Sequence, residues 1–271
     1  MKNEKKNISI DRKKYLKKIK IKKITILFFQ IAILLSLIVL WEILGDLEII
    51  DTFIMSQPSR ILETLVNLKS NNLLTHIAVT TYETVIGFLI GTVLGTIIAI
   101  VLWWSDYLSA IFEPYLVVLN SLPKVALGPI IIIWVGAGTP AIIVMAVAIS
   151  LIVTILENLN GFSKTDKELI KMAETFNASK FQILTKIVIP SNISTFINSL
   201  KVNIGLSLVG VISGEFLVSK AGLGYLIVYG GQVFKLDLVM TSVLILGILS
   251  GVMYGIVLLL EKTISKTRLK T

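Results

Sequence analysis

The chain has 271 residues, 55% of them hydrophobic, a mean hydropathy of +0.86 and a formal net charge of +9. A lipid core needs about 20 mainly apolar residues per helix, so several uncharged runs of roughly that length exclude a water-soluble fold. The runs are 24–41, 84–105, 125–156 and 238–260. The lack of cysteine excludes disulfides and thiol nucleophiles, and a single histidine excludes a histidine-based metal cluster or triad.

The positive charge lies in one segment at the N-terminus. Residues 1–23 hold eleven Lys/Arg and two acidic residues, which accounts for the whole net charge. Basic residues beside a first span hold that end in the cytoplasm and favour contact with anionic membrane lipid. No nucleic-acid partner is expected, because no basic stripe interleaved with aromatics is present. The following apolar run exceeds a signal-peptide core and lacks a small-residue cleavage site, so we expect a retained first span.

Six membrane spans are expected in an all-α membrane protein. An even number places both termini on one side, and the positive-inside rule makes that side cytoplasmic. Segments assigned to the cytoplasm hold 20 of the 26 basic residues, whereas the external loop 46–77 holds two basic and four acidic residues. His76 is expected to be a polar loop residue at the start of the second span. The spans are predicted near 24–45, 78–104, 112–135, 139–160, 194–217 and 237–261.

Two spans carry glycines at four-residue spacing. This spacing places the glycines on one helix face, where two backbones can approach closely. We expect tight packing inside the bundle, with a subunit interface as the alternative. The glycines are Gly87, Gly91 and Gly95 in the second span and Gly247, Gly251 and Gly255 in the sixth.

The third span is interrupted by the sequence Ser121-Leu122-Pro123-Lys124. Proline removes a helical donor, and freed carbonyls at membrane depth are tolerated where they line a cavity or are buried in protein. The break therefore indicates either a translocation path or a kink that serves packing. The residues expected on a path or at a gate are Asn120, Ser121 and Pro123.

The segment 161–190 predicts two short amphipathic helices on the cytoplasmic side. Thr165 to Glu168 and Ser179 to Gln182 each have the capping-box pattern. Asn177 suits the left-handed residue that ends a helix, and Pro190 is expected to stop the second run. The first helix has an apolar face formed by Leu169, Met172, Ala173 and Phe176. Such a pair of helices either lies on lipid or docks into a partner protein.

Glu215, near the end of the fifth span, is the intramembrane charge of greatest interest. A charge at this depth is costly and faces a cavity or a partner. Lys201, fourteen residues earlier, is about 21 Å away along a helix and too far to pair with it. Glu215 is thus a candidate gate or path residue, or a structural anchor. Glu157 and Asn158 at the inner end of the fourth span are expected to orient the loop that follows.

The segment from Lys171 to Pro190 resembles the cytoplasmic coupling motif of ABC importer permeases, written EAA, three residues, G, nine residues, I-x-L-P. Ala173 and the ending Ile187-Val188-Ile189-Pro190 match the motif. Lys171 replaces the glutamate, Met172 the first alanine and Asn177 the glycine. Five further stretches resemble the nitrate/sulfonate/taurine-type permeases: 122–129, 134–138, 214–216, 221–226 and 237–239.

The resemblance implies a type I ABC importer permease in a bacterial cell membrane. It would act as a homodimer with two ABC ATPase subunits and an extracytoplasmic solute-binding protein. The chain lacks a G-x-x-x-x-G-K-[ST] phosphate loop, so the permease is not expected to be an enzyme, and no cofactor is expected. Residues implied in ATPase coupling are Lys171, Met172, Ala173, Phe176, Asn177, Ala178, Ile187 and Pro190.

The domain organisation that follows is a basic arm, one membrane domain and a short tail. The arm is 1–23, the permease domain is 24–261 with coupling helices at 161–190, and the tail is 262–271. The resemblance implies a small oxyanion substrate such as a sulfonate, taurine or nitrate. The alternatives are a vitamin-precursor ABC importer permease and a secondary transporter driven by an ion gradient; the latter favours inverted repeats and a carboxylate-rich midplane site.

Overall fold

The computed structural model describes residues 10–67 and 72–268, in which all secondary structure is helical and no strand occurs. The predicted all-α membrane fold is confirmed. The chain divides into two compact units, residues 1–63 and 64–271, which are treated separately below. Among the described residues, five helices are long and apolar enough to cross a membrane, or six if one bent pair counts as a span.

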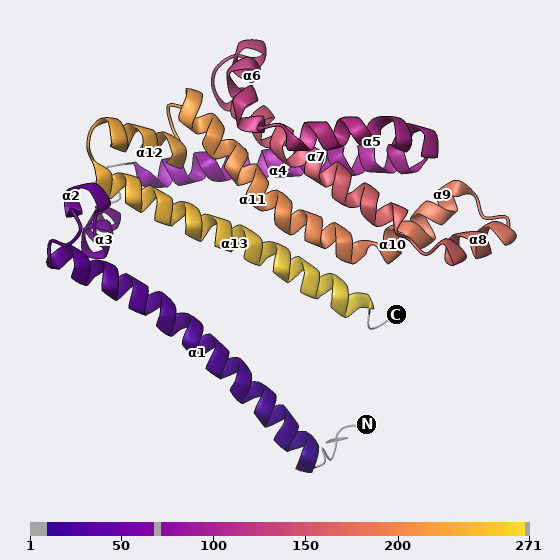
Figure 1. Ribbon diagram of the computed structural model, residues 1–271, viewed down its shortest axis with the longest axis horizontal. Coiled ribbons are helices and arrows are strands. Elements are labelled where there is room, and N and C mark those ends of the chain that lie inside the picture. Colours follow the sequence, from indigo (N-terminus) through magenta and orange to yellow (C-terminus); the bar gives the residue numbers. More distant parts are fainter. Residues whose placement is uncertain (1–9, 68–71, 269–271) are drawn as a thin grey trace. The chain divides into compact units, whose positions relative to one another are not determined.

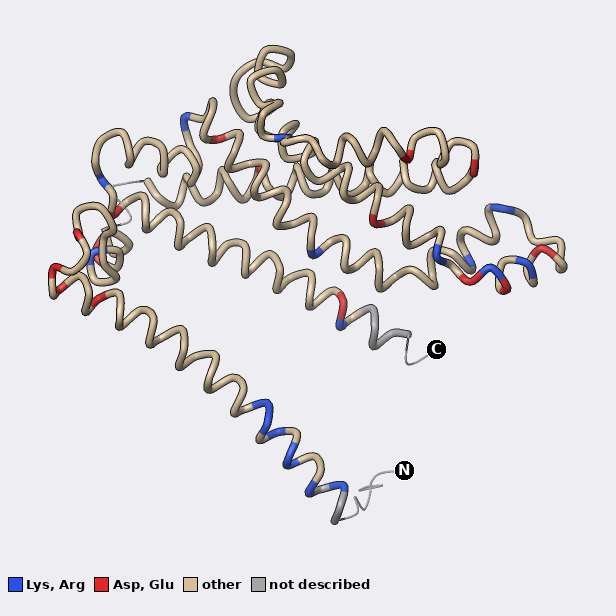
Figure 2. The backbone as a smooth tube through the Cα atoms, in the orientation of Figure 1, with Lys and Arg blue, Asp and Glu red and all other residues tan. Residues whose placement is uncertain are grey.

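The first unit consists of α1 (Ile10–Asp46), α2 (Thr52–Met55) and the start of α3 (Pro58–Val66). The basic residues from position 10 onward belong to α1, which continues without a break into the apolar run (Figure 2). The described residues of the predicted arm and the first span therefore form a single continuous helix. Within this unit the backbone N–H of Ser59 donates to Glu42 Oε2 at 3.0 Å, which ties α3 to α1.

The second unit contains the other four uninterrupted spans (Figure 1). Their positions agree with the predicted second, fourth, fifth and sixth spans, with longer ends. α12 (Leu223–Gln232) is an additional short helix between the last two. The four spans are α4 (Leu73–Trp103), α7 (Thr139–Ser163), α11 (Ile193–Val218) and α13 (Leu236–Arg268).

The predicted third span is broken at the expected place. α5 (Asp106–Ser121) ends before Pro123, and the short η1 (Lys124–Leu127) leads into α6 (Gly128–Val135). The two arms enclose an angle of 89°, far more than a proline kink inside one rod. Hence α5 and α6 form either one strongly bent span or a re-entrant segment.

The core of the second unit forms where α7 packs against both α4 and α11. The glycines of α4 make the first contact possible, since a Cβ at Gly87 would lie 2.6 Å from the Cβ of Ala146. Polar side chains add links between the helices: Asn158 Nδ2 donates to Thr96 Oγ1 at 3.0 Å, and Asn203 donates to Thr154. Asn158 thus joins α7 to α4, while the role predicted for it in orienting the following loop stays a prediction.

The two glycine stripes have different surroundings. Gly87, Gly91 and Gly95, here the α4 stripe, meet Ala146, Ser150 and Thr154 of α7. Gly247, Gly251 and Gly255, here the α13 stripe, have no neighbouring atom of the second unit within 4 Å of a Cβ built on them. Tight packing inside the bundle is therefore confirmed for the α4 stripe, whereas the described residues of the second unit leave the α13 stripe uncovered.

Candidate functional site

The segment predicted to couple to a partner forms a bent helical loop at one end of the second unit. It comprises α8 (Lys167–Thr175), α9 (Lys180–Ile183), the π-helical η2 (Leu184–Val188) and α10 (Ile189–Ser191). Asn177 has φ 55°, in the left-handed region, as predicted for the turn between the two helices. The loop follows α7 directly and leads directly into α11.

One of the two predicted capping boxes is present. Ser179 accepts from the backbone N–H of Gln182, and the Gln182 side chain accepts from the N–H of Ser179. The box predicted at Thr165 is wrong, because Asp166 is the N-cap and accepts from the N–H of Glu168. Thr165 is buried and accepts instead from Asn192 Nδ2 at 2.7 Å, so tertiary contact competes with local capping.

Pro190 does not stop the helical run, contrary to the prediction. The chain widens into the π-helix η2 just before it and continues through α10 to Ser191. A proline lacks the N–H that would bind the carbonyl four residues back, and a π-bulge is one way in which a helix absorbs that loss. The result is a change of direction before α11.

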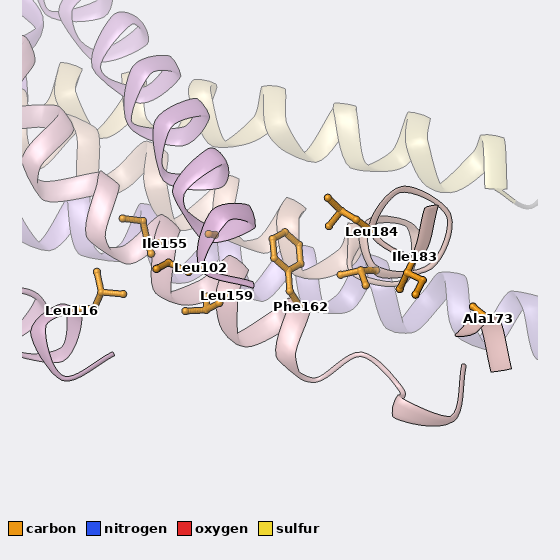
Figure 3. Packing of buried hydrophobic residues seen from close by; sticks show 10 residues of the cluster. Leu102, Leu116, Ile155, Leu159, Phe162, Ala173, Ile183 and Leu184 are labelled. Carbon is orange, nitrogen blue, oxygen red and sulfur yellow. The ribbon is translucent and has the colours of Figure 1, made fainter. Parts of the chain in front are cut away.

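The loop is anchored to the bundle by an apolar cluster. Phe162 at the end of α7 packs with Ile183, Leu184 and Val188, and all four are at most 5% exposed (Figure 3). The cluster continues along α7 and onto α4 and α5. These contacts fix the α9–η2 segment against the C-terminal end of α7.

The opposite side of the loop presents uncovered apolar side chains. Phe176 is 80% exposed, Phe181 63% and Met172 53%, while Lys171 and Asn177 are also exposed. A small groove of about 240 Å³ runs between the two helices, lined by Ala173, Phe176, Ala178, Gln182, Ile183, Lys186 and Ile187. Pro190 is half-buried behind it. We call the surface formed by Met172, Phe176 and Phe181 the coupling surface.

Lys180 connects this loop to a second helix hairpin. Its Nζ donates to the backbone oxygen of Trp104 at 2.7 Å, at the C-terminal end of α4. Carbonyls at a helix C-terminus lack intrahelical partners and carry partial negative charge, so a cation is stabilising there. The sequence analysis did not single out Lys180, since no spacing rule relates it to Trp104.

The candidate path residues at the break of the third span are exposed in the single chain. Asn120, Ser121 and Pro123 all lie on its surface. Lys124 Nζ donates to the backbone oxygen of Asn120 at 3.0 Å, and Ser121 Oγ donates to that of Val117 at 2.9 Å. These bonds satisfy carbonyls near the break, and none of the three residues is a hydrogen-bond partner of Glu215.

Glu215 is 1% exposed and lies in a buried polar cluster near the C-terminal end of α11, the end away from the coupling loop. Thr80 Oγ1 of α4 donates to Glu215 Oε1 at 2.6 Å, and the N–H of Gly224 donates to Oε2 at 2.5 Å. Thr80 also accepts from the N–H of Leu223 at 2.8 Å. Glu215 therefore binds one free amide at the start of α12, that of Gly224, while Thr80 binds the next one, and the cluster joins α4, α11 and α12.

Gly222 is required at this turn for a steric reason. It has φ 118°, and a Cβ there would collide with the carboxylate of Glu215. Its N–H donates to His76 Nδ1 at 2.9 Å. The prediction that His76 is a loop residue is wrong: it lies within α4 and is a hydrogen-bond acceptor for the turn.

Glu83, one turn of α4 beyond Thr80, escaped the sequence analysis. It is fully buried and lies beside Glu215 and Thr139. The sequence contained one signal for this residue, because Glu83 directly precedes the uncharged run 84–105. Lys201 does not pair with Glu215, as predicted, and instead forms an ion pair with Glu261 at 2.8 Å.

These features define a multi-pass helical membrane protein with an exposed, partly apolar surface loop. Residues 91–267 match the family described as "Binding-protein-dependent transport system inner membrane component". The chain belongs to this family. It is an inner-membrane permease component of a binding-protein-dependent ABC importer, not itself an enzyme, and the system includes an ATPase and a binding protein.

Similar proteins agree on the class and differ in substrate. A probable ABC transporter permease protein of Haemophilus influenzae is 29% identical to this chain. The aligned region covers 80% of this chain and 89% of the relative. The putative aliphatic sulfonates transport permease protein SsuC of Bacillus subtilis is 24% identical, with 86% and 84% covered. The formylaminopyrimidine transport permease protein ThiX of Halalkalibacterium halodurans is 26% identical, with 70% and 76% covered.

A solved structure is similar in fold. Inward-facing MetNI, a methionine ABC transporter, contains a chain that matches with a TM-score of 0.64 at 17% identity, covering 70% of this chain and 95% of that one. This similarity supports the ABC importer permease fold.

Proposed function

We propose that this permease opens a path for a small polar solute when an ATPase subunit moves its coupling surface. The observation that carries the proposal is the exposure of Phe176, Phe181 and Met172 on a loop whose base is packed into the bundle. Apolar side chains on a charged, amphipathic loop are suited to a groove in a partner protein. This arrangement supports a coupling role for the residues from Lys171 to Pro190.

The proposed orientation places the coupling loop and both termini in the cytoplasm. The loop and the N-terminal part of α1 carry several basic residues (Figure 2), and the sequence after Glu261 holds four more. The positive-inside rule assigns such segments to the cytoplasm. The outer end, with α12 and the Glu215 cluster, would then face the binding protein, and Glu215 would anchor that end rather than line the path.

We propose that the complete transporter contains two permease copies and two ATPase subunits. In each permease, residues 24–261 would form the membrane domain, between a basic N-terminal arm and a basic C-terminal tail. The relatives support two substrate groups: sulfonates, taurine and related oxyanions, and vitamin precursors such as a pyrimidine. The first group is the one that the resemblance of the sequence to sulfonate and taurine permeases favours.

The test is ATPase co-purification with a matched pair of variants. Phe176→Asp places a charge on the coupling surface, while Phe234→Asp makes the same change at a residue of similar exposure, 70%, in the turn between α12 and α13. We expect Phe176→Asp, and also Ala173→Asp in the groove, to abolish ATPase recovery and ATP-driven uptake while membrane insertion is retained. Equal recovery with Phe176→Asp and Phe234→Asp would contradict the proposal.

A further inference from the structure

Two acidic side chains meet inside the second unit, at the end where α11 leads into α12. Glu83 of α4 is fully buried, and Glu215 of α11 is 1% exposed. Their carboxyl groups lie within hydrogen-bonding reach of each other. Two ionised carboxylates repel each other, and neither can donate a hydrogen bond. This contact therefore needs something between the two groups that both can bind.

The geometry of α4 explains why the two groups meet. Thr80 and Glu83 stand three residues apart, so they share one face of the helix. From that face Thr80 Oγ1 donates to Glu215 Oε1 at 2.6 Å. Glu83 follows one turn further along and also meets Thr139 at the start of α7. The pair thus lies where α4, α7 and α11 converge.

The surroundings of the pair supply no balancing positive charge. Among the described residues, neither carboxyl group forms an ion pair. His76 of α4 accepts from the N–H of Gly222 and stacks on Tyr225 of α12. Lys220, in the turn between α11 and α12, is exposed. Burial of two like charges without a cation is strongly unfavourable, which favours a neutral form of one carboxyl group.

The hydrogen bonds indicate which of the two groups is neutral. Both oxygens of Glu215 accept from donors, Oε1 from Thr80 and Oε2 from the N–H of Gly224. Such donors stabilise an ionised carboxylate. Beside Glu83 the structure places the hydroxyl of Thr139 and the carboxyl group of Glu215. A protonated Glu83 matches these neighbours, because its O–H can donate to Glu215 while its carbonyl oxygen accepts from Thr139.

We propose that Glu83 and Glu215 bind one proton between them, carried by Glu83 and donated to Glu215, and that this proton holds α4 against α11. Without it, two adjacent negative charges would repel each other where little water screens them. A metal ion is a poorer occupant, because no group of three or more His, Cys, Asp or Glu side chains able to hold one occurs among the described residues. The inference depends on neither the coupling role nor the substrate.

A neighbouring cavity gives the pair a route for proton exchange. Its volume is about 450 Å³, which is enough for several water molecules, and Thr139, Val79 and Ser219 contribute to its lining. Thr139 therefore borders both the cavity and Glu83. A hydroxyl group both donates and accepts, so Thr139 can pass a proton between that water and Glu83.

The test compares Glu83→Gln with Glu261→Gln in the purified full-length permease. Glutamine at position 83 can donate an N–H to Glu215 and accept from Thr139, as the protonated glutamate would, but it has no proton to release. The control makes the same change in a partly exposed ion pair with Lys201. Melting temperatures are measured in detergent from about pH 5 to about pH 8, a range in which ordinary carboxyl groups stay ionised.

In this range the unfolded chain has both carboxyl groups ionised, whereas the folded pair keeps one proton. The folded state then binds more protons than the unfolded state, so its stability falls as the pH rises. For one proton, we expect the wild-type melting temperature to fall by about 4 °C per pH unit relative to that of Glu83→Gln, until the folded pair also ionises. Glu261→Gln should keep the wild-type slope.

Two further measurements test where the proton lies. Glu215→Gln would turn an N–H donor toward Thr80 or Gly224, which are themselves donors to this side chain. It should therefore lower the melting temperature more than Glu83→Gln does at about pH 5, where the pair is intact. In the infrared spectrum at about pH 7, the band of a protonated carboxyl group should be present in the wild type and lose intensity in Glu83→Gln.

The proposal would be overturned by equal pH slopes in the wild type and Glu83→Gln, or by a carboxyl band of unchanged intensity. A larger loss of stability in Glu83→Gln than in Glu215→Gln, or failure of Glu83→Gln to fold, would also overturn it, because glutamine supplies the same hydrogen bonds at position 83. A wild-type melting temperature that rises with added Na⁺ or Ca²⁺, with no such rise in Glu83→Gln, would show a bound cation in place of the proton.

Discussion

α4 and α13 carry the same glycine spacing, and their surroundings differ completely. Against the α4 stripe, α7 places Ala146, Ser150 and Thr154 so closely that any side chain there meets them. Against the α13 stripe, the described residues of the second unit place no neighbouring atom within 4 Å. Four-residue spacing makes a helix face flat, but it does not specify which surface covers that face.

The comparison extends to polar contacts. On α4, Thr80 forms a hydrogen bond with Glu215, and Thr96 forms one with Asn158. Hydrogen bonds therefore hold its packed face at two positions along the helix. The buried hydroxyl of Ser242 on α13 donates only to its own backbone, at Leu238. α4 is therefore expected to be sensitive to substitution along its packed face, and α13 tolerant along its stripe.

The largest effect is expected for Gly95→Leu. A Cβ at Gly95 would lie 2.6 Å from Thr154 Cβ and 3.1 Å from the backbone oxygen of Leu151, and a backbone cannot move aside as a side chain can. Overpacking of this kind costs about 3 kcal/mol. The melting temperature of the purified chain in detergent should fall steeply, while Gly251→Leu on the other stripe should leave it nearly unchanged. A similar fall in both variants would remove the distinction between the stripes.

Glu215→Ala should be the next most harmful change. It leaves Thr80 Oγ1 and the N–H of Gly224 without their buried acceptor, which costs about 2 kcal/mol. Glu261→Ala is the control, since it removes a partly exposed ion pair worth less than about 1 kcal/mol. Thermal unfolding in detergent distinguishes them, and an equal loss in both variants would contradict a special role for the cluster.

Gly91→Ala should have a moderate effect that a second substitution relieves. A Cβ at Gly91 would collide with Ser150 Oγ, the end of a side chain, while the next atom is 3.4 Å away. We expect a loss of about 1 kcal/mol, recovered in the double variant with Ser150→Ala because the clash is gone. Additive losses in this double-mutant cycle would show that the two positions do not meet.

Gly251→Ala should have the smallest effect and the opposite sign. Because the described residues of the second unit place no neighbour there, the gain in helix propensity, up to about 1 kcal/mol, is not offset by a clash within that unit. A slightly higher melting temperature is expected for the purified permease. A lower one, or loss of a permease dimer in cross-linking, would show that a second copy covers the α13 stripe.

Much of the fold could be predicted because the controlling signals are local. Uncharged runs of membrane length located the spans, and Pro123 located the break between α5 and α6. Ser179 and Gln182 formed the predicted capping box, and Asn177 adopted the left-handed turn. Thr165 and Pro190 were misjudged because the contact with Asn192 and the π-helix η2 outweighed their local preferences.

The sequence by itself determined the membrane class, the helix positions and the two short coupling helices, since hydropathy, helical spacing and turn chemistry act over a few residues. Only the tertiary structure decided which surfaces meet: the partners of Glu215, the burial of Glu83 beside it and the covering of one glycine stripe. These depend on residues tens to more than a hundred positions apart, which no local pattern relates. Packing brings such residues together because each apolar face must be covered, and the geometry of the whole bundle selects the neighbour.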